Sequence, residues 1–292
     1  MTKIPLLVVV GPTASGKSAY AIKKAIELGG EIISGDSMQI YRGMDIGTAK
    51  PSTEEMQGVP HHLIDIANIE EPFSAARFLE LASGAIADIS SHGKLPIIAG
   101  GTGLYIDTLI SGTQLSATAD DPILRESLFR YAEENGASAL HSRLAKVDPE
   151  AAKTIHPNNI KRVARAIEIY ELTGETKTEL DKKSKQGESI YAPHTVYIQP
   201  KERETIYERI DKRVEVMFSL GLEAEVKSLY EKGLKETPTA SQAIGYKEFY
   251  PYFEGFCDIQ AVKEAICLNT RHYAKRQLTW FNRKPADEII YI

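Results

Sequence analysis

The sequence predicts an α/β fold, in which a parallel sheet flanked by helices is interrupted by an inserted all-helical subdomain. Three observations point to it. An apolar run at 6–10, typical of a buried parallel strand, leads into a glycine-rich loop and a helix. The same order of strand, glycine turn and helix returns at 95–110. From 121 to 180, in contrast, the apolar residues follow helical spacing with almost no strand signal.

The first part of the chain alternates strands and helices. Helix 16–28 follows the first strand, and short strands are predicted at 31–34 and 63–66. Ser74 is the expected N-cap of a helix that stops at Gly93. A strand at 95–99 and a helix over "LYIDTLI" complete this part.

Helices dominate the rest of the chain. Pro122 and Pro157 lie near the starts of two helices in the insertion, which end at Gly136 and Gly174. Strand character returns with "HTVYIQP". Further helices are predicted at 202–220, 222–232, about 241–253 and 258–282, before a last strand "EIIYI". We therefore predict a core formed by 1–112 and 195–292, and a helical insertion at 113–194.

Composition indicates a soluble globular protein. The chain has 292 residues, of which 42% are hydrophobic and 26% charged. No run of 18 apolar residues exists, so no membrane span is expected, and we expect a cytoplasmic protein. Cys257 and Cys267 lack metal-ligand spacing and are expected to be reduced core thiols. The net charge of −5 argues weakly against nucleic acid, although a local basic face suffices for binding.

The glycine-rich loop "GPTASGKS" fits the phosphate-loop pattern in full. Its backbone N–H groups and the positive end of the following helix favour phosphate. Lys17 adds a point charge, and Ser18 can ligate a Mg²⁺ ion that bridges phosphate oxygens. The predicted diphosphate- or nucleotide-binding residues are Gly11, Pro12, Thr13, Ala14, Ser15, Gly16, Lys17 and Ser18.

The motif recognises phosphate but not the group attached to it. It is equally typical of an ATP-binding protein, such as an ATPase or a small-molecule or nucleotide kinase. A kinase needs a metal-holding acidic residue after a strand, and Asp65 in "HLIDI" is the candidate. The long loop at 34–51 helps to decide. It places Asp36 at the carboxyl end of a strand, beside the phosphate loop, where ligands bind in open parallel sheets.

Seven stretches closely resemble the tRNA dimethylallyltransferase family. In chain order they are "GPTASGKS", "SGDSMQIYRGMDIGTAKP", "GVPHHLIDI", "FSAARF", "AGGTGLYI", "HPNNIKRVARAIEIY" and "AKRQLTWFNR", from Gly11 to Arg283. The resemblance implies transfer of a dimethylallyl group from dimethylallyl diphosphate to N6 of adenosine 37 in tRNA, next to the anticodon. The products are N6-isopentenyladenosine and diphosphate. Gly35 and Lys247 depart from common family residues without touching the chemistry.

The resemblance also implies catalytic roles. Lys17 and a second cation, Arg213, stabilise the negative charge on the leaving diphosphate. Asp36 is the candidate general base for the amine proton, although an aspartate here also commonly caps its own turn. Thr102 is either a helix N-cap, a substrate contact, or both.

The resemblance implies that the core at 1–112 and 195–292 is catalytic and that the insertion at 113–194 binds RNA. A tRNA-binding surface is expected because the acceptor base must leave its stack in the anticodon loop. The candidate contacts are Asp36, Ser37, Met38, Gln39, Thr102, Arg125, Lys161, Arg162, Arg165, Gln242, Gly245, Tyr246, Lys247 and Arg276. Tyr273, Trp280 and Phe281 lie among basic residues and either stack on RNA or belong to the core. His61 and His62 are expected to be structural.

We expect the partners to be the tRNA anticodon stem-loop and dimethylallyl diphosphate, with Mg²⁺ as cofactor and a monomeric enzyme without a membrane partner. A kinase on the same fold predicts phosphoryl transfer from ATP. A third possibility is a non-catalytic RNA-binding module that keeps the loop as scaffold. It predicts RNA binding that ignores diphosphate.

Overall fold

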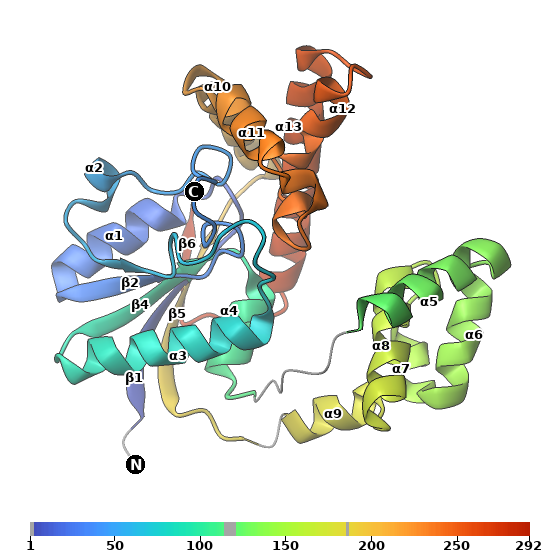
Figure 1. Cartoon of the computed structure of the whole chain (residues 1–292). Helices are drawn as coiled ribbons and strands as arrows, with labels where there is room; N and C mark the ends of the chain where they lie inside the picture. The colour runs from blue at the N-terminus through green and yellow to red at the C-terminus, as the bar shows by residue number, and fades with distance from the viewer. Residues whose placement is uncertain (1–2, 114–120, 185–186) are drawn as a thin grey trace. The chain divides into compact units, whose positions relative to one another are not determined.

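A computed structural model describes residues 3–113, 121–184 and 187–292 of the chain (Figure 1). The chain divides into two compact units. The first unit combines Met1–Ile110 with Ser189–Ile292, and the second is Ser111–Glu188. In the part that the structure describes, no helix is both long and apolar enough to cross a bilayer.

Six parallel strands form one sheet in the first unit, in the order β3-β2-β4-β1-β5-β6. This confirms the predicted α/β fold class. The longest ladder joins β1 to β5, with Val8 opposite Thr195. The strands are β1 Ile4–Val10, β2 Gly30–Ser34, β3 His61–His62, β4 Leu95–Gly100, β5 Tyr191–Gln199 and β6 Glu288–Tyr291.

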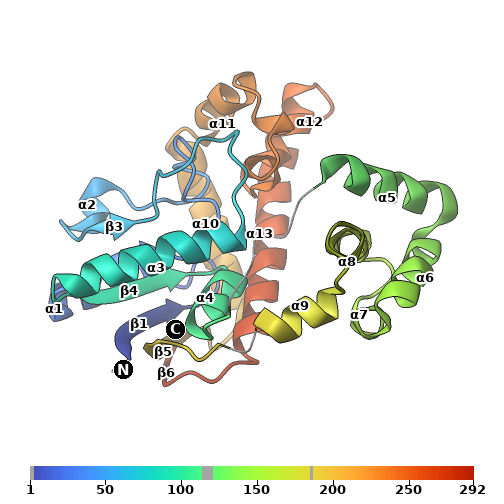
Figure 2. The same cartoon turned by 60° about the horizontal axis from the view of Figure 1, so that its bottom comes forward.

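The alternation of side chains along β1 separates two apolar layers. Leu7 and Val9 pack with residues of helix α1 (Lys17–Leu28). Leu6, Val8 and Val10 face the opposite layer, which contains helices α3 (Ala75–Ser91) and α4 (Gly103–Ile110). Helices α10 (Arg203–Ser219), α11 (Leu222–Glu231) and α13 (Ile259–Phe281) extend this second layer beside the carboxyl ends of the strands (Figures 1 and 2).

The second unit is helical throughout its described residues and has its own apolar core, in which Leu140, Leu144 and Val163 are fully buried. Its helix ends follow the local signals: Asp121 caps α5, Gly136 separates α5 from α6, and Gly174 ends α8 in a left-handed conformation. The helices are α5 Pro122–Asn135, α6 Ala137–Val147, α7 Pro149–Thr154, α8 Ile160–Thr173 and α9 Lys177–Ser184.

Several predicted boundaries differ from the structure. The strand expected at 63–66 is His61–His62 instead, because Leu63 and Asp65 take left-handed backbone conformations that end it. Strand β5 starts at Tyr191, so the second unit ends at Glu188, before the predicted residue 194. After the buried Tyr191, residues 192–194 of β5 are exposed and pair only with β1. An edge position of this kind tolerates Pro193, and the exposed residues interrupt the apolar pattern of the strand.

The helix predicted at about 241–253 is broken into short turns. Gly245 has a φ of 94°, which no continuous right-handed helix allows. The remaining short elements are α2 Thr53–Met56, α12 Tyr250–Phe253 and the 3₁₀ turns η1 Leu234–Glu236, η2 Ala240–Gln242 and η3 Lys247–Phe249.

Candidate functional site

The phosphate loop leaves β1 at its carboxyl end and turns tightly into α1. A Cβ on Gly11 would lie 2.7 Å from the carbonyl oxygen of Ile198, so glycine is required there. Ala14 and Gly16, with φ of 61° and 86°, bend the loop back on itself. The hydroxyl of Ser15 is buried inside it and has no hydrogen-bond partner among the described residues. A buried, unpaired donor in such a loop is suited to a ligand oxygen.

Lys17 follows directly and folds over the loop. Its ammonium group donates a hydrogen bond to the carbonyl oxygen of Pro12 at 3.3 Å. Desolvation by the surrounding protein lowers the pKa of Lys17 to about 8. Asp36 opposes this shift and Arg213 adds to it, so the three charges lie within one electrostatic neighbourhood.

A first cavity of about 480 Å³ opens beside the loop. Its lining includes Gly16, Lys17 and Ser18 of the loop and two arginines of α10, Arg209 and Arg213. The cavity therefore combines loop backbone, a hydroxyl and three cationic side chains, which is the chemistry that polyphosphates require.

Asp36 follows β2 and performs the turn-capping role that its residue type favours. Its Oδ1 accepts a hydrogen bond from the backbone N–H of Met38 at 2.9 Å. Its Oδ2 makes no hydrogen bond to any described residue and remains available for a second role. Its charge also faces Arg213. Desolvation lowers the pKa of Arg213, and Asp36 opposes that effect.

A second cavity, of about 260 Å³, lies on the Asp36 side. Arg213 lines both cavities and donates to the carbonyl oxygen of Thr48 at 3.3 Å, so one guanidinium connects them. Thr102 does not line this cavity. Its Oγ1 accepts a hydrogen bond from the backbone N–H of Ser37, a lining residue, at 3.2 Å. The sequence-predicted residues that line this cavity are Thr13, Asp36, Ser37, Met38, Arg213, Gln242, Gly245, Lys247 and Arg276. Thr13, expected among the diphosphate-binding residues, thus lines the second cavity and not the first.

Three comparisons bear on what these cavities are for. A family model described as IPP transferase matches residues 39–284. The tRNA dimethylallyltransferase of Bacillus subtilis is 49% identical over 283 residues, which cover 97% of this chain and 89% of that protein. The relative from Geobacillus thermodenitrificans is 50% identical, with the same coverage.

The chain belongs to the IPP transferase family.

Two solved structures extend this likeness to the fold. The full-length tRNA isopentenylpyrophosphate transferase from Bacillus halodurans shares 44% identity, with a TM-score of 0.71, over 99% of this chain and 90% of that one. A eukaryotic dimethylallyltransferase acting on tRNA shares 29% identity, with a TM-score of 0.81, over 99% of this chain and 73% of that one.

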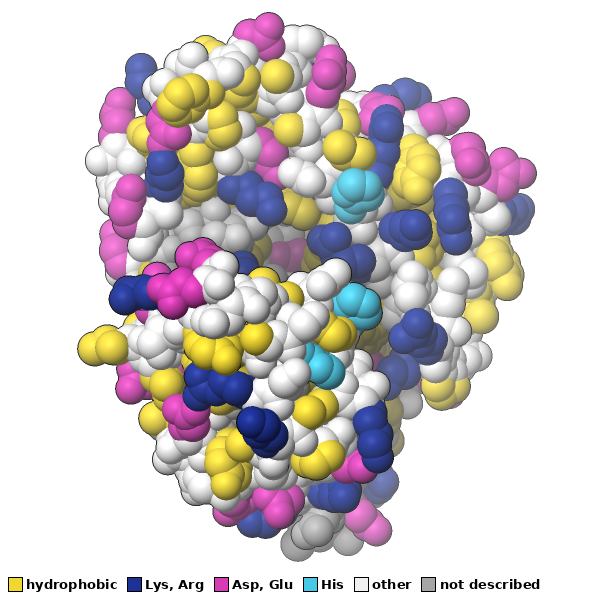
Figure 3. Space-filling view, turned by 90° about the vertical axis from the view of Figure 1, so that its right-hand side faces the viewer, with side chains coloured by type: hydrophobic (Ala, Val, Ile, Leu, Met, Phe, Trp, Pro, Cys, Tyr) yellow, Lys and Arg dark blue, Asp and Glu magenta, His cyan; other side chains and the backbone are white. Residues whose placement is uncertain are grey.

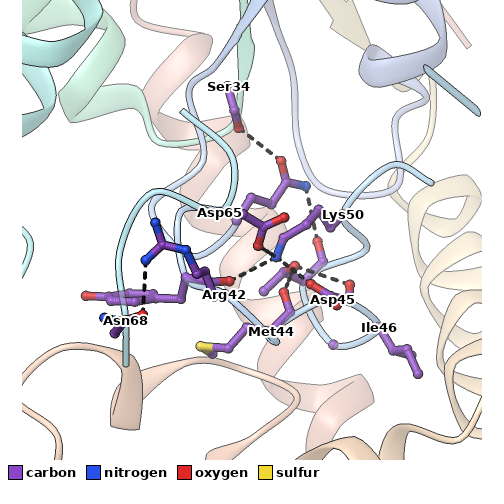
Figure 4. A network of polar contacts seen from close by, with 12 residues as sticks. Ser34, Arg42, Met44, Asp45, Ile46, Lys50, Asp65 and Asn68 are labelled. Atoms are coloured by element: carbon purple, nitrogen blue, oxygen red, sulfur yellow. Dashed lines mark hydrogen bonds and ion pairs between the residues drawn. The ribbon is translucent and has the colours of Figure 1, made fainter. Parts of the chain in front are cut away.

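In this IPP transferase the loop at 34–51 is held by a buried lysine (Figure 4). The ammonium of Lys50 donates to the carbonyl oxygen of Tyr41 at 2.9 Å and pairs with Asp45 and Asp65, each at 2.5 Å. Asp65, the metal-holding candidate of the kinase hypothesis, is therefore a partner of Lys50. It lines a separate groove, not the phosphate-loop cavity.

Two expected tRNA contacts, Gln39 and Tyr246, make contacts within the chain. The amide of Gln39 accepts from Ser34 and donates to the carbonyl oxygens of Thr48 and Ala49, so it shapes the loop and does not line the second cavity. Tyr246 is completely buried, which corrects the prediction that it contacts RNA. Its neighbours Gln242, Gly245 and Lys247 line the cavity, but its own ring packs beneath it.

Glu225 of α11 is a site residue that the sequence did not reveal. Its carboxylate accepts three successive backbone N–H groups, from Asp45, Ile46 and Gly47, at 2.8 to 3.2 Å. The hydroxyl of Tyr246 donates to the same group at 2.6 Å. Glu225 thereby fixes the loop that presents the Thr48 carbonyl to Arg213. Its separation of about 180 residues from that loop leaves no local signal.

The expected basic residues of the second unit fall into two groups. Arg125 and Arg165 both pair with the fully buried carboxylate of Glu168, at 2.9 and 2.8 Å, which holds α5 against α8. Lys161 and Arg162 are exposed on α8. On the face shown in Figure 3, lysine and arginine side chains lie interspersed with acidic ones, not in one continuous patch.

The aromatic residues of α13 lie in three different environments. Phe281 is core and packs 5.8 Å from the Tyr197 ring. Trp280 is partly exposed, and its indole N–H donates to Asp107 at 2.8 Å. Tyr273 lines the second cavity, with the guanidinium of Arg276 5.6 Å from its ring centre. His62 hydrogen-bonds Glu31 at 2.7 Å, in keeping with a structural role.

Proposed function

We propose that this chain transfers the dimethylallyl group of dimethylallyl diphosphate to N6 of adenosine 37, beside the anticodon of tRNA. The reaction yields N6-isopentenyladenosine and diphosphate. One observation carries the proposal: Arg213 lines both the cavity of the phosphate loop and the cavity of Asp36. A group released from a diphosphate in the first cavity is thereby close to a nucleophile in the second.

The first cavity suits the leaving group. Lys17 and Arg213 both line this cavity and would hold diphosphate oxygens with their charges. The buried, unpaired hydroxyl of Ser15 lies within the same loop and would offer one further donor. As the bond from carbon to the bridging oxygen breaks, negative charge grows on the diphosphate. These cations stabilise that charge more strongly in the transition state than in the bound donor.

The phosphate-loop residues fit a Mg²⁺ ion whose ligands come partly from the protein and partly from the diphosphate. No cluster of three or more histidine, cysteine, aspartate or glutamate side chains occurs within the described ranges. Ser18 lines the phosphate cavity, so its hydroxyl, water and diphosphate oxygens would hold Mg²⁺. A bound Mg²⁺ neutralises charge on the diphosphate oxygens.

The second cavity suits the amine. The bond from N6 to the first prenyl carbon forms as the carbon–oxygen bond breaks, and N6 must then lose a proton. We assign the acceptance of that proton to Oδ2 of Asp36, while Oδ1 keeps the turn in shape by accepting the N–H of Met38. We assign Thr102 to positioning this turn, because its hydroxyl holds the N–H of Ser37.

The tRNA contacts follow from the same arrangement. The acceptor base is turned out of the anticodon loop into the second cavity, where Lys247 and Arg276 offer cations to its backbone. Lys161 and Arg162 of the second unit offer further phosphate contacts on the stem-loop. We propose a monomer that acts on tRNA in the cytoplasm.

The test uses purified protein, Mg²⁺, labelled dimethylallyl diphosphate and unmodified tRNA with adenosine after the anticodon. We expect label on that adenosine and none when guanosine replaces it. A parallel reaction offers ATP labelled in the γ-phosphate together with small acceptors. Label transfer from ATP, without prenylation of tRNA, would refute the proposal in favour of a kinase.

A further inference from the structure

Gln277 of α13 connects the two strand ends that carry the site. Its Oε1 accepts the backbone N–H of Thr13 in the phosphate loop at 2.8 Å. Its Nε2 donates to the carbonyl oxygen of Gly101 at 3.0 Å, in the turn that follows β4. The side chain is only 5% exposed, so both bonds are shielded from water.

The surroundings of Gln277 are built for an amide of this size. A Cβ on Gly101 would lie 2.1 Å from Nε2 of Gln277, so glycine makes room for the contact. Thr13 lines the second cavity, and Thr102 follows Gly101 and holds Ser37. Tyr273, one turn earlier on α13, and Arg276, the residue directly before Gln277, line the same cavity.

We propose that Gln277 is a positioning residue for prenyl transfer. It sets the spacing between the phosphate loop, which carries the donor, and the turn at Gly101 and Thr102, which supports the acceptor side. The role needs one acceptor and one donor on a neutral group, because Thr13 offers an N–H and Gly101 a carbonyl. This inference rests on the proposed function.

Loss of this bridge is expected to affect turnover more than donor binding. The loop keeps its own bond from Ser15 N–H to the carbonyl of Pro12, and Lys17 and Arg213 stay in place. Donor and acceptor would nevertheless be misaligned, and a displacement of about 1 Å is able to cost about 100-fold in rate. We therefore expect kcat to fall about 10- to 100-fold, with the Kd for inorganic pyrophosphate within about threefold of wild type.

The experiment compares Gln277→Glu and Gln277→Met in the full chain with Gln260→Glu, an exposed glutamine on the first turn of α13. Transfer to tRNA is measured from pH 6 to pH 9, and pyrophosphate affinity and Tm are measured for each variant. In Gln277→Glu the ionised carboxylate repels the Gly101 carbonyl, whereas the protonated acid restores the donor. The deficit of Gln277→Glu should therefore shrink as pH falls, whereas that of Gln277→Met should not change with pH.

Wild-type turnover in both Gln277 variants would overturn the inference while leaving the proposed function intact. The inference would also be overturned if the turnover of Gln277→Glu fell equally at every pH and in proportion to its Tm. Such a result would indicate that Gln277 contributes only to packing. If Gln277→Glu does not fold, Gln277→Met provides the test. A fall in its kcat with unchanged pyrophosphate affinity would support the inference, and an unchanged kcat would overturn it. Absence of prenyl transfer by the wild-type chain would overturn the proposed function and the inference with it.

Discussion

At the scale of single residues, the lowered pKa of Lys17, about 8, sets a pH limit on diphosphate binding. In the unfolded chain its ordinary pKa is 10.5, so between these values the folded chain binds fewer protons. The contribution of Lys17 to stability therefore rises with pH across that window, and its charge is a cost below pH 8. Binding has the opposite trend, because diphosphate needs the protonated amine.

We predict that pyrophosphate affinity of the wild type falls above pH 8 by up to about tenfold per pH unit. Lys17→Arg should remove this dependence, because the guanidinium keeps its charge. Lys17→Met should abolish turnover while raising stability at pH 7 by about 1–2 kcal/mol. Calorimetric titration and thermal unfolding measure both effects. If the pyrophosphate affinities of the wild type and of Lys17→Arg changed with pH in the same way, the titration of Lys17 would not control diphosphate binding.

Asp36 combines a turn cap with the proposed base, and one substitution separates the two. Asp36→Asn keeps an acceptor for the N–H of Met38, so the turn should survive, and pyrophosphate binding should survive at pH 6, where Lys17 stays protonated. Turnover should fall by about 10²- to 10⁴-fold, because the proton acceptor is lost. The pKa of Lys17 should drop as well, since Asp36 raises it. Single-turnover kinetics on prebound tRNA measure the first effect, and retained turnover would remove Asp36 as the base.

At the scale of elements, α11 controls the loop at 44–50 through Glu225. In Glu225→Gln the amide nitrogen replaces one of the oxygens that accept N–H groups, so two donors lose a partner or the side chain rotates away. We expect a loss of about 1–3 kcal/mol and faster amide exchange at Asp45, Ile46 and Gly47. Glu231→Gln, exposed at the end of the same helix, is the matched control. Equal exchange in both variants would show that the loop holds its shape without Glu225.

At the scale of the whole molecule, local patterns predicted the strands, the phosphate loop and the helical insertion. The signals involved, such as the apolar run of β1 or Gly174 at the end of α8, act over a few residues. Long-range bonds escaped prediction: Gln277 meets the phosphate loop across 264 residues. Tyr246 shows a different limit of prediction from sequence. The stretch "QAIGYK" contributes residues to the second cavity, but a motif does not show that the ring of Tyr246 faces the core.

We propose that the second unit adds phosphate contacts for tRNA to the site in the first unit, and this role is testable in the full chain. Lys161→Glu combined with Arg162→Glu should weaken tRNA binding and reduce the slope of log affinity against log salt by about 1–2. Pyrophosphate affinity should not change, because Ser15, Lys17 and Arg213 all belong to the first unit. Lys146→Glu, an exposed lysine on α6, serves as the control for a charge change in the same unit.

A second variant replaces residues 111–188 by a flexible Gly/Ser linker and keeps β5 whole, because Tyr191–Gln199 pairs with β1. The remaining unit contains both cavities and two apolar layers, so it should fold and bind pyrophosphate as the full chain does. Its affinity for tRNA should fall at least about tenfold, since the phosphate contacts of α8 are gone. Filter binding over a salt series measures this loss. Unchanged tRNA affinity in both variants would place the RNA-binding surface entirely on the first unit.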